Sequence, residues 1–155
     1  MRLIDLDVRN GLVRLREKGG TERWQPITLQ LAEHLDTHAR ARGAVLPTDK
    51  LLRYRNGQAI TSRRYDHLWK RIGERVPWVA VQGISTHWLR HTTLTWVERH
   101  FGYGVARAYA GHTDSVGPAT TTYIKADLQA VAAALAGMTG QPHPLAASTE
   151  PPWHE

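Results

Sequence analysis

The sequence predicts a single, mainly helical domain that carries a small β-hairpin. Apolar residues recur at helical spacing in several segments, one segment alternates apolar and basic residues before a Gly pair, and 155 residues suit one ordinary domain. No apolar run approaches the roughly 20 residues that a membrane-spanning helix needs. The N-terminus lacks the apolar stretch of a secretory signal peptide, so we expect a cytoplasmic protein.

The first predicted element is the β-hairpin. Residues 12–16 alternate apolar and basic side chains, ERWQPI follows from residue 22, and Gly19 and Gly20 between them favour a tight turn. This arrangement places Lys18 at the tip of the hairpin.

A helix is predicted after Thr28, which is a good N-cap because its hydroxyl can accept a hydrogen bond from a free backbone amide. A short extended piece at residues 51–54 and an Asn56-Gly57 turn follow the helix. The apolar positions of this helix, which recur until Gly43 ends the pattern, are Leu31, Ala32, Leu35 and Ala39.

An amphipathic helix is predicted after the Thr61-Ser62 pair, and Pro77 is expected to end it. Residues 79–83 are expected to form a loop. The apolar stripe of the helix follows the i, i+3, i+4, i+7 pattern and consists of Tyr65, Leu68, Trp69, Ile72 and Val76.

Three helices are predicted in the C-terminal part. The first follows a Ser85-Thr86 cap and runs from residue 87 to about 99. The second covers residues 105–110 and stops at Gly111, and the third opens at Pro118 and continues past Asp127. The inner face of the first of these helices is expected to consist of Leu89, Thr93, Trp96 and Val97.

The chain is predicted to divide into a domain at residues 1–138 and a disordered tail at residues 139–155. The tail contains four of the eight prolines among small and polar residues, a composition that cannot bury enough apolar surface to fold.

Charge and cysteine content limit the function classes. The chain has 20 Lys and Arg against 14 Asp and Glu, a formal net charge of +6, which makes a polyanion a plausible partner. Residues 49–75 hold eight basic residues against three acidic ones. The chain has no Cys, which excludes disulfides, thiolate catalysis and Cys-ligated metals. Phosphate contacts and a solvated helix face are equally good interpretations of Arg63, Arg64, Lys70 and Arg71.

An ordered set of polar residues carries the chemistry. His87 and Arg90 lie one helical turn apart near a helix start, where free backbone N–H groups favour an anion. His112 follows a short helix directly after Gly111, and Tyr123 stands eleven residues later, before an apolar helix. Each residue alone is a weak signal, but their order together with Lys18 is unlikely to arise by chance.

These motifs resemble the tyrosine recombinases, or phage integrase family, over nearly the whole chain to about Met138. KGGTERWQPIT resembles the family's hairpin with its lysine, THWLRHT its His-x-x-Arg box, and AGHTD with TTTYIKA its histidine and nucleophilic tyrosine. The resemblance implies the catalytic-domain fold that breaks and rejoins DNA. It also implies the catalytic residues Lys18, His87, Arg90, His112 and Tyr123.

Two departures from the family pattern stand out. The interval from His112 to Tyr123 is about two residues longer than usual, which a loop insertion at residues 115–118 can absorb. The family's first catalytic arginine has no match here, since Arg2 falls about two turns too late. We therefore expect a C-terminal piece of an integrase, incomplete at its N-terminus and nearly inactive alone, with apolar surface left uncovered around Leu3, Leu6 and Trp96.

The resemblance implies site-specific recombination of double-stranded DNA without metal or other cofactor. Tyr123 would attack a phosphodiester, forming a 3′-phosphotyrosyl bond and a free 5′-hydroxyl. Arg90 and His112 would hold the nonbridging oxygens, Lys18 would protonate the leaving oxygen, and His87 would assist. Self-association on DNA, a tetramer in the family, is also implied.

Two other classes of function remain open on the residues alone. One is a noncatalytic basic DNA-binding module. The other is a metal hydrolase built on the pairs His87 and His91 or His34 and His38, although HWLRH lacks the Glu of a zinc-peptidase box. Four tryptophans are expected in the core rather than on a base-stacking surface: Trp24, Trp69, Trp88 and Trp96.

Overall fold

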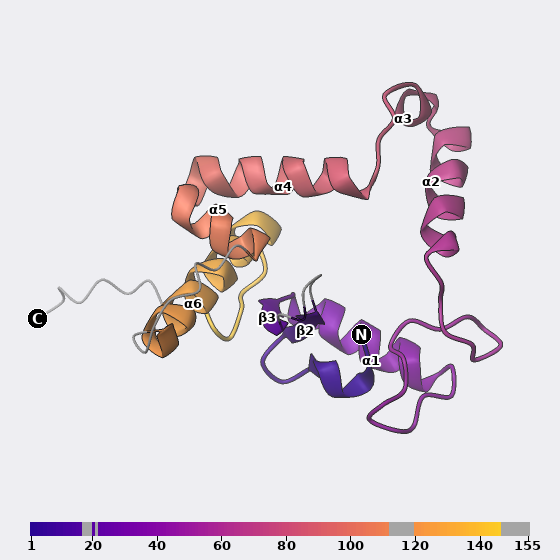
Figure 1. Cartoon of the computed structure of the whole chain (residues 1–155), viewed down its shortest axis with the longest axis horizontal. Helices are drawn as coiled ribbons and strands as arrows, with labels where there is room; N and C mark the ends of the chain where they lie inside the picture. The colour runs from indigo at the N-terminus through magenta and orange to yellow at the C-terminus, as the bar shows by residue number, and fades with distance from the viewer. Residues whose placement is uncertain (17–19, 21, 112–119, 147–155) are drawn as a thin grey trace, which may run out of the picture.

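The computed structural model describes residues 1–16, 20, 22–111 and 120–146, and of residues 120–126 it describes the backbone alone. This part of the chain forms a small antiparallel sheet and several helices, some of which extend away from the sheet, so the mainly helical fold with a small β component is confirmed (Figure 1). The elements are the 3-10 helix η1 (Leu3–Asp5), the strands β1 (Leu6–Asp7), β2 (Leu12–Arg16) and β3 (Glu22–Pro26), and the helices α1 (Leu29–Arg40), α2 (Arg63–Arg75), α3 (Pro77–Val81), α4 (Thr86–Phe101), α5 (Tyr103–Ala110) and α6 (Thr120–Thr139).

The sheet has the order β1-β2-β3, and its β2–β3 pair confirms the predicted hairpin. Val13 lies opposite Gln25 in this antiparallel register. Gly11 leads into β2 with a φ of 61°, and a Cβ at this position would lie 2.8 Å from the carbonyl oxygen of Ile27. The turn therefore requires glycine. Lys18, predicted at the hairpin tip, lies outside the described residues.

Asp5 is a buried carboxylate, 2% exposed, that ties η1 to β2. Arg14 donates two hydrogen bonds to its Oδ1, from Nη2 at 2.7 Å and from Nε at 3.0 Å, and the backbone N–H of Arg2 donates to its Oδ2 at 2.8 Å. Burial by itself raises the pKa of Asp5. The hydrogen bonds and the charges of Arg14 and Arg16 lower it by more than burial raises it, so the pKa lies below its ordinary value.

We expect Asp5→Ala to lower the free energy of unfolding by about 1–3 kcal/mol at neutral pH, because Arg14 loses its charged acceptor. The depressed pKa makes this contribution complete above the ordinary carboxyl pKa of about 4 and removes it as the pH falls through the lower folded-state value. Urea unfolding at neutral pH and near pH 2.5 tests this, with a smaller difference from wild type expected in acid.

The control for this prediction is Asp36→Ala. Asp36 accepts from Arg40 Nε at 2.8 Å in an i, i+4 pair whose arginine side chain is 61% exposed, so its removal should cost less than about 0.5 kcal/mol. Equal losses in the two variants would contradict the assigned role of Asp5.

The helix predicted after Thr28 is α1. The Thr28 hydroxyl accepts from the backbone N–H of Leu31 at 3.2 Å, as expected of an N-cap. Ala39 of α1 forms a buried cluster with Ala44 and Leu51, and Leu3 and Leu6 pack against that cluster. Leu3 and Leu6 themselves are therefore partly covered, whereas Ile4 next to Leu3 is 55% exposed, so the apolar surface expected around them is present in part.

The three predicted C-terminal helices are α4, α5 and α6, and they pack together. Their shared cluster consists of Val97, Ala106 and Ala134, with Trp96 partly buried against it, so Trp96 is not left uncovered either. Leu89 is 48% exposed, which corrects its assignment to the inner face of α4. Leu89 lies two turns before Val97 on the helix, toward the end that extends away from α5 and α6 (Figure 1).

Residues 79–83, predicted as a loop, correspond in part to the short helix α3. Pro77 ends α2 and at the same time starts α3, because proline suits the first turn of a helix, where its missing N–H has no partner. Gly73 lets α2 and α3 approach, since a Cβ there would lie 3.1 Å from that of Ala80.

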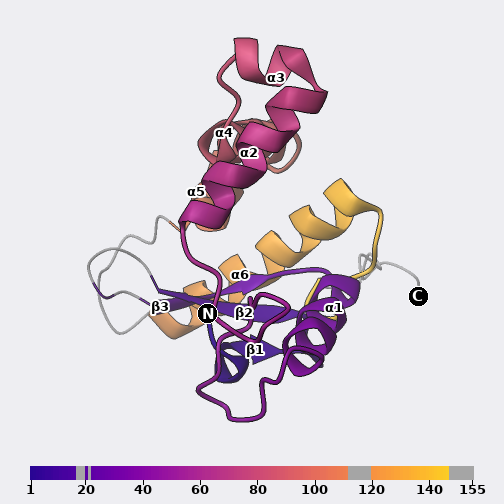
Figure 2. The same cartoon turned by 90° about the vertical axis from the view of Figure 1, so that its right-hand side faces the viewer.

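The apolar stripe of α2 does not face a core. No residue of α2 is buried, and Tyr65 and Leu68 are each 46% exposed. Figures 1 and 2 show α2 and α3 projecting away from the sheet, so only the part of the stripe that faces α3 and α4 is covered. The 3.6-residue period predicted the helix, but the period alone does not supply a packing partner.

The first residues of the proline-rich tail pack on the domain. His143 is 6% exposed and its Nε2 lies 3.1 Å from the Gly11 carbonyl oxygen, while the Leu145 N–H donates to its Nδ1 at 3.1 Å. Gln141 bonds Gln30 of α1. This corrects the prediction of disorder for residues 139–146, of which Thr139 ends α6, whereas residues 147–155 lie outside the described part. No helix among the described residues is long and apolar enough to cross a membrane.

Candidate active site and DNA-binding surface

Helix α4 carries the His-x-x-Arg box in its first turns. Ser85 precedes the helix in an extended conformation, and the indole N–H of Trp69 on α2 donates to the Thr86 hydroxyl at 2.9 Å. His87 and Arg90 follow one turn apart with exposed side chains. The box is therefore accessible, at a helix start whose free backbone amides favour an anion.

Arg90 also contacts the end of α5. Its Nη2 donates to the carbonyl oxygen of Ala110 at 2.7 Å. Ala110 is the last residue of α5, and Gly111 after it adopts a φ of 85°, the left-handed conformation that commonly ends a helix. The contact therefore places Arg90 next to the last residue of α5, two residues before His112 in the sequence. His112 itself lies outside the described residues.

Tyr123 belongs to the first turn of α6, and its side chain lies outside the described part. The helix that carries it is held by α5, through Ala106 and Ala134, and by strand β3. Figure 2 shows α6 alongside the sheet. Of the five predicted catalytic side chains, the structure describes those of His87 and Arg90, so the assembly of the five stays a prediction.

Two of the tryptophans expected in the core are exposed, Trp24 by 40% and Trp88 by 46%. Trp88 directly precedes Leu89 and lies on the same helical row as Thr92 and Trp96, four and eight residues later. This row borders a shallow hollow lined by Trp88, His91, Thr92, Thr95, Trp96, Arg99 and His100.

The four basic residues assigned to possible phosphate contacts share helix α2, and all are exposed: Arg63, Arg64, Lys70 and Arg71. Because α2 projects from the sheet, these side chains can reach a polyanion without displacing other parts of the described chain (Figure 2). Their contact with DNA stays a prediction.

We expect Arg63→Ala with Arg64→Ala to weaken DNA binding and to flatten the slope of log affinity against log salt by about one unit per lost contact. Fluorescence anisotropy with a labelled duplex over a range of salt concentrations measures both quantities. Arg40→Ala at the end of α1 with Arg42→Ala just after it removes the same charge and is the control. A salt slope that falls equally in both double variants would show that only net charge matters.

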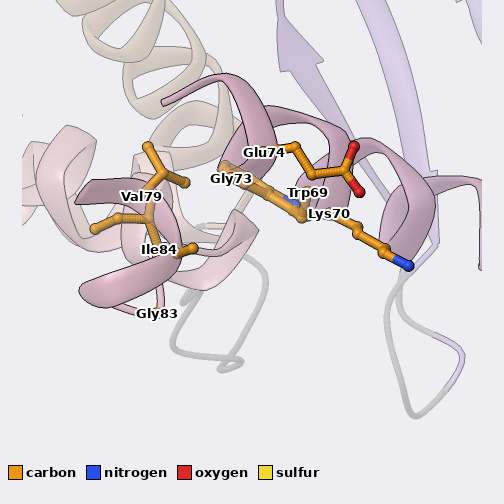
Figure 3. A pocket seen from close by; sticks show the side chains of 8 residues that line it. Trp69, Lys70, Gly73, Glu74, Val79, Gly83 and Ile84 are labelled. Carbon is orange, nitrogen blue, oxygen red and sulfur yellow. The ribbon is translucent and has the colours of Figure 1, made fainter. Parts of the chain in front are cut away.

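A pocket is lined by α2, by α3 and by the turn that follows α3 (Figure 3). Its walls are mainly apolar, and its charged side chains, Lys70 and Glu74, come from the rim of α2. It contains none of the predicted catalytic residues. The lining consists of Trp69, Lys70, Gly73, Glu74, Val79, Ala80, Gly83 and Ile84.

The fold and the exposed box define a basic helical domain with a small sheet and a projecting arginine-rich helix, features typical of a DNA-acting protein. The chain belongs to the phage integrase family, whose sequence model matches residues 1–129. This confirms the resemblance to the tyrosine recombinases, and membership implies site-specific recombination with DNA as substrate in general. No curated protein and no solved structure matches the chain.

Proposed function

We propose that this chain cleaves and rejoins DNA through a 3′-phosphotyrosyl bond at Tyr123. The observation that carries the proposal is the accessible His-x-x-Arg box of α4, with Arg90 held at 2.7 Å from the end of α5, inside the region that matches the phage integrase family. We also propose the DNA breaking-rejoining fold of the tyrosine recombinases, assembly with further copies on DNA, and action in the cytoplasm.

The proposed reaction exchanges one phosphodiester for another. The Tyr123 oxygen attacks phosphorus and passes its proton to a base, for which His87 is the candidate, the bond to the 5′ oxygen breaks, and Lys18 protonates that oxygen as it leaves. The reverse attack by a 5′-hydroxyl restores a DNA strand and frees the tyrosine. No water, metal or oxidant enters this balance.

Charge stabilisation is the main task of the remaining residues. The nonbridging oxygens gain negative charge as the tyrosine attacks. Arg90 and His112 are proposed to stabilise this charge. A phenol has an ordinary pKa of about 10, so cationic donors must favour its deprotonated form near neutral pH. His87, one turn before Arg90, is proposed to assist the nucleophile or to orient a phosphate oxygen.

A noncatalytic DNA-binding module is the second candidate function. Its support is the set of exposed basic side chains on α2: Arg63, Arg64, Lys70 and Arg71. Such a module would bind DNA through α2 and form no covalent bond.

A suicide DNA substrate, which traps the covalent intermediate, separates the two candidates. We expect the 155-residue chain to form adduct about 10²–10³-fold more slowly than the extended protein, meaning the same chain preceded by the family's arginine-bearing segment, because one charged donor is missing. Circular dichroism checks that both fold. Equal and rapid adduct formation would show that the second arginine is not needed, and absence of adduct in both would favour the binding module.

A further inference from the structure

Two exposed histidines face one another on helix α4. His87 and His91 are four residues apart, and their Nε2 atoms lie 2.8 Å from each other. The ring centroids are 4.4 Å apart and the ring planes are nearly perpendicular, at 86°. At this distance the two ring nitrogens share one hydrogen bond, so both Nε2 atoms face the same space and a metal ion would replace the shared proton. Residues four apart share a helix face, and histidines at this spacing can hold one metal ion between them.

The distance between the two nitrogens favours a particular coordination geometry. Imidazole nitrogens bind first-row divalent metals at about 2.0–2.1 Å, so atoms 2.8 Å apart subtend an angle of about 84–89° at a shared ion. That angle suits the tetragonal ligand arrangement of Cu²⁺ or Ni²⁺. Tetrahedral Zn²⁺ needs a nitrogen separation of about 3.3 Å and fits the pair less well.

A second histidine pair with the same spacing serves as an internal comparison. His34 and His38 lie four residues apart on α1, but the Nε2 of His38 accepts a hydrogen bond from the backbone N–H of Arg53 at 3.4 Å. Burial, followed by the charge of Arg42, also lowers the pKa of His38. The Nε2 of His38 is therefore bonded to the Arg53 backbone rather than to His34, whereas the Nε2 atoms of His87 and His91 bond each other, so spacing alone does not make a site.

Two further described histidines, His100 and His143, have a ring nitrogen next to a backbone carbonyl oxygen. The Nδ1 of His100 lies 2.8 Å from the Trp96 carbonyl oxygen, and the Nε2 of His143 lies 3.1 Å from that of Gly11. At His87 and His91 the two nitrogens meet each other instead. Arg90, between them in sequence, directs its Nη2 to the Ala110 carbonyl oxygen.

We propose that His87 and His91 form a two-histidine chelate for a tetragonal divalent metal ion, Cu²⁺ or Ni²⁺. No group of three or more His, Asp or Glu residues suited to a metal occurs among the described residues, so water fills the remaining ligand positions. The bound ion occupies the Nε2 of His87. If His87 acts as the proposed function states, the bound ion prevents its imidazole from contacting the DNA phosphate and so inhibits strand cleavage.

Copper titration of the 155-residue chain, purified without a polyhistidine tag, tests the site. Calorimetry gives affinity and stoichiometry, and the nitrogen hyperfine pattern in electron paramagnetic resonance reports the number of bound imidazoles. We expect one site with two nitrogens in the wild type. His91→Ala should weaken that site by about 10–100-fold or more, at least as much as losing a supporting ligand contact costs.

The matched control is His34→Ala, which breaks the same spacing on α1 and should leave affinity and nitrogen count unchanged. His91→Asn is the second variant in case His91→Ala does not fold, as judged by circular dichroism. Equal copper affinity in wild type and in the folded His91 variant, or a larger loss in His34→Ala, would overturn the proposal.

Cleavage of a suicide substrate by the extended protein separates this proposal from the proposed function. We expect copper to inhibit the wild type and the His34→Ala variant at concentrations that leave His91→Ala active, each compared with the same protein in chelator. Copper binding without inhibition would keep the site and overturn its inhibitory role. Cleavage with no copper binding would overturn the site and leave the proposed function intact.

Discussion

Replacing Tyr123 with Phe is expected to abolish the covalent protein–DNA adduct formed by the extended protein. Phe keeps the ring and its packing but lacks the oxygen that attacks phosphorus, so no slower route through the same residue remains. DNA affinity should change by less than about twofold, because phosphate contacts supply most of it. Denaturing gels of suicide-substrate reactions measure the adduct, and fluorescence anisotropy measures the affinity.

Tyr103→Phe is the matched control for this experiment. Tyr103 starts α5, is 63% exposed, and loses the same single oxygen when replaced with Phe. The control should form adduct at the wild-type rate. An undiminished adduct in Tyr123→Phe would exclude Tyr123 as the nucleophile.

Replacing Arg90 with Ala is expected to slow adduct formation by about 10²–10³-fold or more, because the nonbridging oxygens lose a charged donor. The same change removes the hydrogen bond to Ala110, so the fold of α5 is checked by circular dichroism. Arg90→Lys keeps the charge but not the forked geometry and should recover only part of the rate. Single-turnover cleavage of the suicide substrate gives the rates.

The control is Arg99→Ala, two to three turns further along α4, where the arginine lines the hollow next to His100. It should retain a cleavage rate within about threefold of wild type, since only remote charge is lost. If Arg90→Ala and Arg99→Ala cleave equally fast, Arg90 does not act at the reacting phosphate.

The hairpin and α1 could be predicted because their signals are local. The hairpin is indicated by the alternation of apolar and basic residues at 12–16, and the start of α1 by the Thr28 cap. The end of α5 is indicated in the same way by Gly111, which adopts a positive φ. Each signal acts within one or two turns of chain, so no distant partner is needed to recognise it.

The packing of α2 and of the tail could not be predicted from such signals. The stripe of α2 is periodic, but whether Tyr65 and Leu68 are covered depends on where the helix lies. The tail's composition indicates disorder, yet His143 fits against Gly11, which is 132 residues away in sequence. Contacts over such separations leave no local pattern in a single sequence.

The candidate site divides in the same way. The order of Lys18, His87, Arg90, His112 and Tyr123 was readable through the resemblance to the family, whose model matches the region containing all five. The contact of Arg90 with Ala110 and that of His87 with His91 were not readable, because they depend on how α4 meets α5 and on side-chain orientation.

Mass spectrometry of the trapped adduct tests the central claim most directly. The extended protein is reacted with a suicide substrate, digested with nuclease and trypsin, and the peptide covering residues 108–125 is fragmented to locate the nucleotide. We predict a nucleotide joined through its 3′ phosphate to Tyr123, with Tyr109 of the same peptide unmodified. A nucleotide joined to another residue, or joined through its 5′ phosphate, would contradict the proposal that this chain cleaves DNA with Tyr123.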